Sequence, residues 1–161
     1  MLRSLDLALL RLLRTVGHGP PVELAVQRFS RLGEHGGLWL VTAATGAALH
    51  RRRRRAYLSA LRAIAVTHVV NTTLKLAVRR ARPLLEDLPA LLPTLSDRSW
   101  PSTHAATSFA GARTLGVALP APPLYAAATA MALSRPYLGV HYPSDVLAGA
   151  ALGLVVAELT S

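Results

Sequence analysis

Five consecutive arginines, residues 51–55, stand between two apolar stretches of the sequence. The stretch before them, residues 38–50, contains no Asp, Glu, Lys or Arg, and the stretch after them, residues 56–78, is mainly apolar. Five adjacent cations cannot be buried together without partners, so the chain must meet water here. An excess of arginine in a short loop is typical of the cytoplasmic side of a membrane protein. The sequence therefore predicts a cytoplasmic loop between two helices.

The composition limits the classes of protein to which the chain can belong. Hydrophobic residues make up 52% of its 161 residues and charged residues only 16%, below the roughly 25% of ordinary soluble domains. The net charge of +10 suits either a nucleic-acid-binding protein or a membrane protein with an anionic substrate. Only 5% of the residues are aromatic, and they form no stripe with the basic ones, so we predict no nucleic acid partner. Cysteine is absent, which excludes disulfides and thiolate chemistry.

The N-terminal residues 1–33 have the pattern of two amphipathic helices, 2–16 and 21–32, separated by "GHGPP". Charges are spread through the first helix and no small-residue cleavage site follows it, so it is not interpreted as a signal peptide. Such helices either span a membrane or lie on its surface, and the pattern fits both.

Five further segments are mainly apolar and rich in Ala, Gly, Ser and Thr. They are residues 38–50, 56–78, 104–119, 124–134 and 144–157. None is a clean run of about 20 apolar residues, the usual length of a spanning helix, but small residues let membrane helices approach closely. We therefore predict an all-α fold: a polytopic membrane bundle of about five to six helices in one domain, 1–161, with 38–157 as its core. The alternative is a soluble helical bundle.

The arginine loop also predicts a topology, because each later helix reverses the direction of the chain. Helix 56–78 runs outward from the cytoplasm, and the helices that follow alternate inward, outward and inward. This order gathers one set of polar residues near the extracytoplasmic face: Lys75, Arg82, His104, Arg135, His141 and Asp145. The arginines of "RRARP" also fall on that outer face, against the usual charge bias, so they need another purpose there.

Three short clusters contain these residues, and the first two suit phosphate binding. In "KLAVRRARP", Lys75 and Arg82 are seven positions apart, about two helical turns, so both can point the same way. "PSTH" opens a predicted helix, where the backbone N–H groups of Ser102 and Thr103 can bind an anion. The third cluster, "SRPYLGVHYPSD", adds Arg135. Arginine, lysine and helix-start amides are the groups that bind phosphate oxygens.

The clusters also contain candidates for nucleophilic and acid–base chemistry. His141 and Asp145 are four residues apart, on one face if the turn is helical. A carboxylate on one ring nitrogen fixes the tautomer and makes the other nitrogen a better nucleophile. His104 is then left to protonate a leaving alcohol. The histidines lack the carboxylate or cysteine partners of a metal site, so we expect no metal and no other cofactor.

Each residue taken alone has a simpler explanation. Lys75 and Arg82 fit a helix end whose long side chains reach for the interface. Ser102 fits a helix N-cap, and Asp145 fits a favourable charge at a helix N-terminus. Either histidine could be a satisfied interfacial side chain. These explanations do not account for the arrival of all the groups at one face.

As a set, the clusters resemble the three motifs of the type 2 phosphatidic acid phosphatase (PAP2) superfamily, which also includes vanadium haloperoxidases. The matching residues are Lys75, Arg82 and Pro83, then Pro101, Ser102 and His104, then Ser134, Arg135, His141 and Asp145. These elements span residues 75 to 145, and the helical pattern extends the likeness to most of the chain. One departure is Thr103, because this place is usually glycine.

The resemblance implies a membrane helical bundle of the PAP2 and haloperoxidase type that acts as a metal-independent phosphatase. It implies that His141 forms a phosphohistidine, that Asp145 orients it, and that His104 is the acid toward the leaving alcohol and the base in hydrolysis. Phosphate binding would fall to Lys75, Arg82, Ser102, Thr103 and Arg135. The implied partners are a lipid phosphate and membrane lipids, at the plasma membrane with the site outside.

The short loop between the first two motifs and the Arg- and Ala-rich composition resemble short actinobacterial members of the family. These include proposed phosphatases of decaprenylphosphoryl-5-phosphoribose, so we favour a polyprenyl-linked phosphomonoester of cell-wall biosynthesis. Undecaprenyl diphosphate, phosphatidylglycerol phosphate and phosphatidic acid stay as alternatives, because motifs fix reaction class better than substrate. Two other classes are a vanadate-dependent haloperoxidase and a non-catalytic protein that binds anionic lipids. The sequence indicates no oligomeric state.

Overall fold

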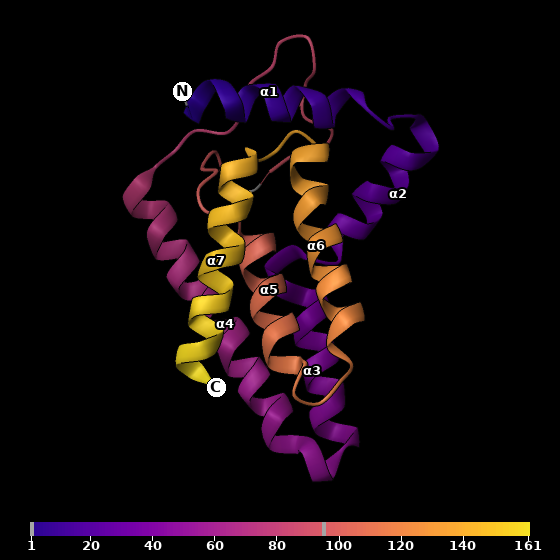
Figure 1. Ribbon diagram of the computed structural model, residues 1–161, viewed down its shortest axis with the longest axis vertical. Helices are drawn as coiled ribbons and strands as arrows, with labels where there is room; N and C mark the ends of the chain where they lie inside the picture. The colour runs from indigo at the N-terminus through magenta and orange to yellow at the C-terminus, as the bar shows by residue number, and fades with distance from the viewer. Residues whose placement is uncertain (1, 95) are drawn as a thin grey trace.

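The computed structural model describes residues 2–94 and 96–161, and regular structure in this part of the chain is helical (Figure 1). Its α-helices are α1 (Leu2–Thr15), α2 (Pro20–Arg31), α3 (Gly37–Leu49), α4 (Arg54–Val78), α5 (Thr103–Leu115), α6 (Ala121–Tyr137) and α7 (Pro143–Thr160). Two 3-10 turns, η1 (Glu34–Gly36) and η2 (Arg51–Arg53), flank α3. The all-α prediction is confirmed. The described residues form seven α-helices rather than five to six, because both N-terminal segments and all five apolar segments fold separately.

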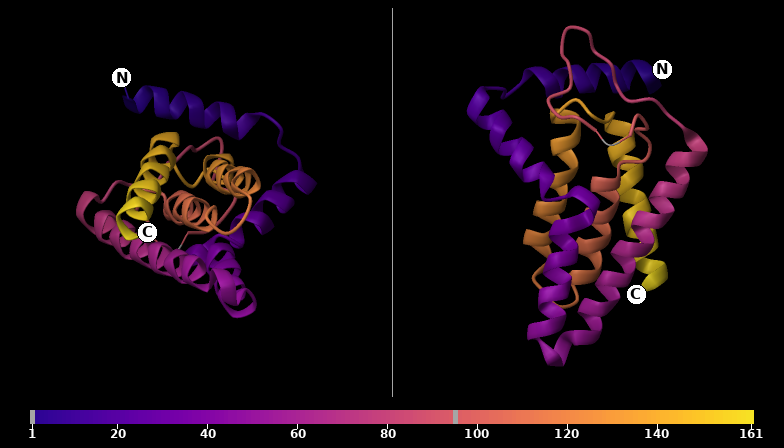
Figure 2. Two further views of the ribbon diagram at one scale, coloured as in Figure 1. Left: turned by 60° about the horizontal axis from the view of Figure 1, so that its bottom comes forward. Right: turned by 180° about the vertical axis from the view of Figure 1, so that it is seen from behind.

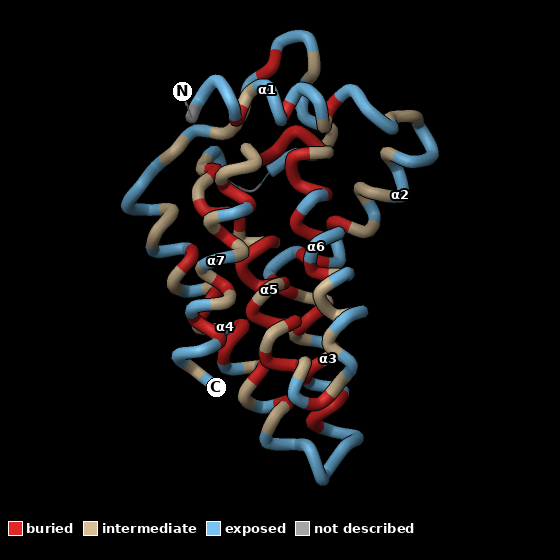
Figure 3. Tube along the Cα trace, in the orientation of Figure 1, coloured by how far each residue is buried: buried red, intermediate tan, exposed pale blue. Residues whose placement is uncertain are grey.

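The central helix of the bundle is α5, and α4, α6 and α7 pack around it (Figures 1 and 2). Helix α3 packs mainly beside α4. Most residues of α5 are buried, whereas the surrounding helices each keep an exposed side (Figure 3). The sequence of α5, THAATSFAGARTL, explains this place, because small side chains let neighbouring helices approach from several sides.

Helices α5 and α7 are in backbone contact because α7 has glycines where they meet. A Cβ atom at Gly149 would collide with the carbonyl oxygen of Ser102, and one at Gly153 with that of Ala106. The two glycines are four residues apart and therefore share a face of α7. This contact holds the start of α5 against the start of α7, and both helix starts carry predicted site residues.

The N-terminal helices cover one end of the bundle and one of its sides. Helix α1 lies across the end, and α2 descends from it toward α3 (Figure 1). Between α2 and α3, His35 (φ 53°) and Gly36 (φ 74°) both adopt the left-handed conformation that turns the chain. Helix α1 buries Leu10 against the bundle. Its exposed large apolar residues are Leu5, Leu9 and Leu12, and Val16, which follows the helix, is exposed too.

Four predicted segment ends differ from the structure by three or more residues. Helices α6 and α7 end later than predicted, at Tyr137 and Thr160, and the other two errors involve turn-forming residues. Helix α5 ends at Leu115 instead of residue 119, and the residues between Gly116 and Pro120 form turns. Helix α6 begins at Ala121 rather than 124, so "PAPP" opens the helix instead of breaking the chain before it. Proline is tolerated in the first turn, where backbone N–H groups have no intrahelical acceptor.

The arginine loop lies at the end of the bundle opposite α1, where η2 joins α3 to α4 (Figure 1). All five arginines, residues 51–55, are exposed. Arg113 of α5 forms an ion pair of 2.5 Å with Glu158, close to the C-terminus of α7. Among the described residues, α7 alone has the length and apolarity of a membrane span, with 18 residues and a mean hydropathy of 1.3.

Candidate active site

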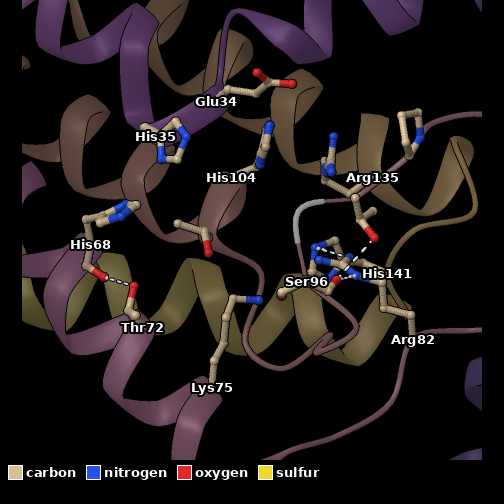
Figure 4. Close-up of a pocket in the computed structure, with 13 residues that line it drawn as sticks. Glu34, His35, His68, Thr72, Lys75, Arg82, Ser96, His104, Arg135 and His141 are labelled. Carbon is tan, nitrogen blue, oxygen red and sulfur yellow. Dashed lines mark hydrogen bonds between the residues drawn. The ribbon is translucent and has the colours of Figure 1, made fainter.

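At the α1 end of the bundle, helix ends and loops enclose a cavity of about 250 Å³ (Figure 4). Its wall comes from η1, α4, α5, α6 and the loops that follow α4 and α6. Six of the eight predicted site residues line it: Lys75, Arg82, Thr103, His104, Arg135 and His141. The other two, Ser102 and Asp145, are fully buried and do not line it. Folding thus brings the three motif clusters to one end of the bundle.

Three cations converge on the cavity and bind neutral groups. Lys75 Nζ lies 3.3 Å from a backbone carbonyl oxygen of the loop after α4. Arg82 Nη1 donates to the carbonyl oxygen of Val140 at 2.6 Å, and Arg135 Nη1 donates to Ser30 Oγ at 2.5 Å. Within residues 2–94 and 96–161, none of the three cations forms an ion pair with a carboxylate. Their charge is therefore available to an anionic ligand.

His141 lies in the loop between α6 and α7, which turns at Gly139 (φ 78°). Its side chain is almost fully buried, and its Nε2 atom is 3.2 Å from Arg82 Nη1. Burial lowers the pKa of His141 below its ordinary value of 6.5, and the charges of Arg82, Arg135 and Lys75 lower it further. The imidazole is therefore neutral at neutral pH and keeps the lone pair that a nucleophile needs.

Asp145 is fully buried in the first turn of α7, behind His141. Its Oδ2 atom is 3.6 Å from His141 Nδ1, which is beyond hydrogen-bond range, and Nδ1 has no hydrogen-bond partner. Oδ2 accepts a hydrogen bond of 2.9 Å from the backbone N–H of Tyr142 instead. The orienting contact predicted for Asp145 is thus a close approach rather than a formed hydrogen bond. Catalytic hydrogen bonds are often long in ligand-free sites and shorten when substrate binds.

Arg80 connects Asp145 to helix α1. Its Nη1 atom donates to Asp145 Oδ1 at 2.7 Å, and its Nη2 atom donates to Asp6 Oδ2 at 2.8 Å. Asp6 also accepts the backbone N–H of Ser144 at 2.9 Å and so caps the start of α7. The Arg80 guanidinium lies 4.1 Å from the ring centre of Tyr142. Sequence analysis missed Asp6 and Arg80, although the unexplained outer arginines of "RRARP" were a signal.

His104 is positioned by the end of α2. Its Nε2 atom is 3.1 Å from the backbone carbonyl oxygen of Ser30, so in the neutral ring Nε2 carries the proton and Nδ1 the lone pair. A Cβ atom at Gly33 would lie 2.8 Å from the His104 ring and 2.5 Å from Met131 Sδ, so a larger residue there would displace one of these side chains. Ser30 Oγ also binds Arg135. Sequence analysis missed Ser30 because its role depends on where α2 packs.

The second motif is only partly exposed to the cavity. The backbone N–H of Ser102 donates to the carbonyl oxygen of Asp145 at 2.9 Å, so it is not free for the predicted phosphate contact. The Ser102 hydroxyl is buried without a partner and remains able to donate. Thr103, in place of the usual glycine, lines the cavity and donates from Oγ1 to Asn71 at 2.6 Å. Its backbone N–H lies in the first turn of α5, where no intrahelical acceptor exists.

The cavity is suited to an anion. Cations in its wall repel a metal ion, and they attract the oxygens of a phosphate. Among the described residues, no group of three or more His, Cys, Asp or Glu is arranged to hold a metal ion. A neutral histidine beside a second histidine and three cations is a set of groups that can transfer a phosphoryl group.

A profile of the PAP2 superfamily matches residues 56–161, and the chain belongs to this superfamily. Decaprenylphosphoryl-5-phosphoribose phosphatase of Mycobacterium tuberculosis is 43% identical over 143 residues, which cover 86% of this chain and 79% of that protein. The phosphatase of the same name from Mycolicibacterium smegmatis is 36% identical over 154 residues, which cover 91% of this chain and 82% of that protein.

Two crystal structures have the same fold. LpxE of Aquifex aeolicus superposes with a TM-score of 0.83 at 29% identity, over 97% of this chain and 94% of that one. A transmembrane PAP2 type phosphatidylglycerolphosphate phosphatase from Bacillus subtilis superposes with a TM-score of 0.78 at 26% identity, over 99% and 84%. The chain is therefore a membrane protein and a phosphatase, which hydrolyses phosphoric monoesters.

Proposed function

We propose that the chain hydrolyses the terminal phosphomonoester of a polyprenyl-linked lipid such as decaprenylphosphoryl-5-phosphoribose. The mycobacterial relatives, which cover most of the chain, support this substrate. The observation that carries the proposal is the cavity, in which three cations adjoin His141 and His104 and pair with no carboxylate of the described residues. The exposed arginine loop at the opposite end supports an active site on the extracytoplasmic face of the plasma membrane.

In the first step, Lys75, Arg82 and Arg135 bind the phosphate oxygens and His141 Nε2 attacks phosphorus. A phosphorus–nitrogen bond forms while the bond from phosphorus to the leaving oxygen breaks. The negative charge of the bound phosphate stabilises a protonated His104, which gives its Nδ1 proton to the leaving oxygen, so the alcohol departs neutral. The positive charge that develops on the His141 ring is stabilised by Asp145, which closes on the Nδ1 proton.

In the second step, water hydrolyses the phosphohistidine. His104, now neutral, accepts a proton from the water at Nδ1 while the water oxygen attacks phosphorus. The phosphorus–nitrogen bond breaks, its electron pair returns to His141 Nε2, and inorganic phosphate leaves. The Ser30 carbonyl group holds His104 in the same position throughout, through the hydrogen bond to Nε2.

The test is phosphate release by the protein in detergent with EDTA, from prenyl-phosphoribose, prenyl diphosphate and glycerolipid phosphates. His141→Gln should lower kcat/KM by at least about 10³-fold, as loss of a catalytic nucleophile does. The matched control is His50→Gln, because His50 is exposed at the arginine end. Acid quenching should trap labelled phosphate on the wild-type chain and not on His141→Gln. Full turnover by His141→Gln would contradict the mechanism, and exclusive turnover of glycerolipid phosphates would contradict the substrate.

A further inference from the structure

The cavity extends beyond the phosphate-binding cations to a polar wall that the proposed chemistry does not use. This wall is formed by His35 of η1 and by His68 and Thr72 of α4. In Figure 4, His104 lies between this wall and His141. A cavity of about 250 Å³ equals roughly eight waters of about 30 Å³ each, more than the five heavy atoms of a phosphate need. Space therefore remains for part of the leaving alcohol.

The side chains of the wall are placed to bind a ligand that extends from the phosphate. His68, Thr72 and Lys75 follow one another at spacings of four and three, so they share one face of α4. From Lys75 to His68 this face covers about 10 Å at 1.5 Å per residue. His35 faces His68 with 5.7 Å between the ring centres. The Nδ1 atom of His68 is buried without a hydrogen-bond partner, and such groups are rare unless a ligand or water binds them.

The direction of the reaction assigns this wall to the leaving alcohol. In phosphoryl transfer the attacking and leaving atoms lie roughly in line on opposite sides of phosphorus. Because His141 attacks and His104 protonates the leaving oxygen, the rest of the alcohol continues past His104 toward His35 and His68.

We infer that His35, His68 and Thr72 form a subsite that hydrogen-bonds the hydroxyl groups of a sugar carried by the scissile phosphate. The subsite selects phosphomonoesters of sugar hydroxyl groups over phosphates attached directly to a hydrocarbon chain. The inference rests on the proposed function and names the headgroup class of the same site. Imidazole and hydroxyl groups both donate and accept, as sugar hydroxyls do, and a hydrocarbon would leave them unpaired. The carboxylate of Glu34, which also lines the cavity, disfavours a second phosphate joined directly to the scissile one, as in a prenyl diphosphate.

The test compares kcat/KM for two substrates with the same prenyl tail, one carrying 5-phosphoribose and one a phosphate directly on the tail. Thr72→Val and His68→Phe should each lower the ratio of the two values roughly five- to tenfold, which corresponds to one lost hydrogen bond. Thr72→Ser, which keeps the hydroxyl, should keep the ratio within about twofold. The matched controls are Thr73→Val and His50→Phe. Thr73 makes the same bond to the carbonyl group four residues earlier as Thr72 but lies outside the cavity.

The outcomes separate the subsite from the proposed function. Equal losses on both substrates, or no loss on either, would overturn the subsite, because only sugar recognition changes the ratio. Thr72→Ser behaving like Thr72→Val would overturn the role of the hydroxyl. If the wild-type protein prefers the sugar-free phosphate, the subsite is overturned, but the conclusion that the protein is a prenyl-phosphate phosphatase stands. Wild-type turnover of neither prenyl lipid would refute the proposed function, and the subsite would fall with it.

Discussion

The two ends of the bundle hold their arginines in opposite ways. At the loop between α3 and α4, residues 51–55 are exposed and solvated. At the α1 end, Arg135 is only 6% exposed and Arg82 is partly buried, and both point at one cavity with neutral groups as partners. Buried cations without carboxylates are costly, and an anionic ligand relieves that cost. Burial and convergence, rather than the number of charges, distinguish a phosphate site from a surface that orients the chain.

The largest effect that this contrast predicts is for single arginine substitutions at the two ends. Arg135→Gln should lower kcat/KM by about 10²- to 10³-fold, as loss of one partner of a buried charge pair does. Arg52→Gln should change it by less than about twofold, because exposed charges contribute little. Phosphate release from the preferred lipid measures both variants, and similar losses at the two ends would remove the distinction.

A second prediction concerns Arg80, which lies behind the cavity and acts through Asp145. Arg80→Met should lower kcat by about ten- to a hundredfold, because the buried carboxylate of Asp145 loses its ion pair with Arg80. KM should change little, because Arg80 does not line the cavity. Arg80→Lys should recover part of kcat. The separation of kcat from KM is the informative result, and a loss confined to KM would place Arg80 in substrate binding instead.

A third prediction is a shift in pH dependence. The charge of Arg82 lowers the pKa of His141, so His141 should stay neutral as pH falls below 6.5. In Arg82→Gln the pKa of His141 should rise, and the acid limb of kcat/KM should move to higher pH. The substrate phosphate titrates in the same range, with a pKa of about 6, but equally for both proteins. The difference between their profiles therefore reports His141, and superimposable limbs would show that Arg82 does not act on it.

The smallest effect on activity is predicted for single cysteines introduced at the two ends of the bundle to determine which side of the membrane each end faces. The chain has no cysteine, so a single introduced cysteine can be labelled alone. In intact cells, Glu86→Cys at the site end should react with an impermeant maleimide, and His50→Cys at the arginine end should not. Both residues are exposed, so activity should stay within about twofold. The opposite labelling pattern would place the site in the cytoplasm.

Much of this architecture could be predicted from local sequence. The apolar segments and the arginine loop predicted the helices of the bundle. The three sequence motifs predicted which residues lie together, since Lys75, Arg82, His104 and His141 all line the cavity. The helix boundaries around "PAPP" were predicted wrongly because proline can either end a helix or begin one. Tertiary packing determines which of the two occurs.

The residues that sequence analysis missed come from segments whose destination depends on packing. Asp6 and Ser30 lie in helices whose amphipathic pattern predicted a helix but not its neighbours. Ser30 binds Arg135 and Asp6 binds Arg80 only because α2 descends beside α6 and α1 crosses the end of the bundle. His35 enters the cavity wall through a left-handed turn that no periodicity signals.

The central claim is that one buried cationic cavity, and not the exposed arginine loop, binds the phosphoryl group for attack by His141. A structure of the protein with vanadate, which adopts the five-coordinate geometry of phosphoryl transfer, tests it most directly. The account predicts vanadium bonded to His141 Nε2, with its oxygens contacting Lys75, Arg82 and Arg135. Vanadate bound at residues 51–55, or held in the cavity without a bond to His141, would contradict it.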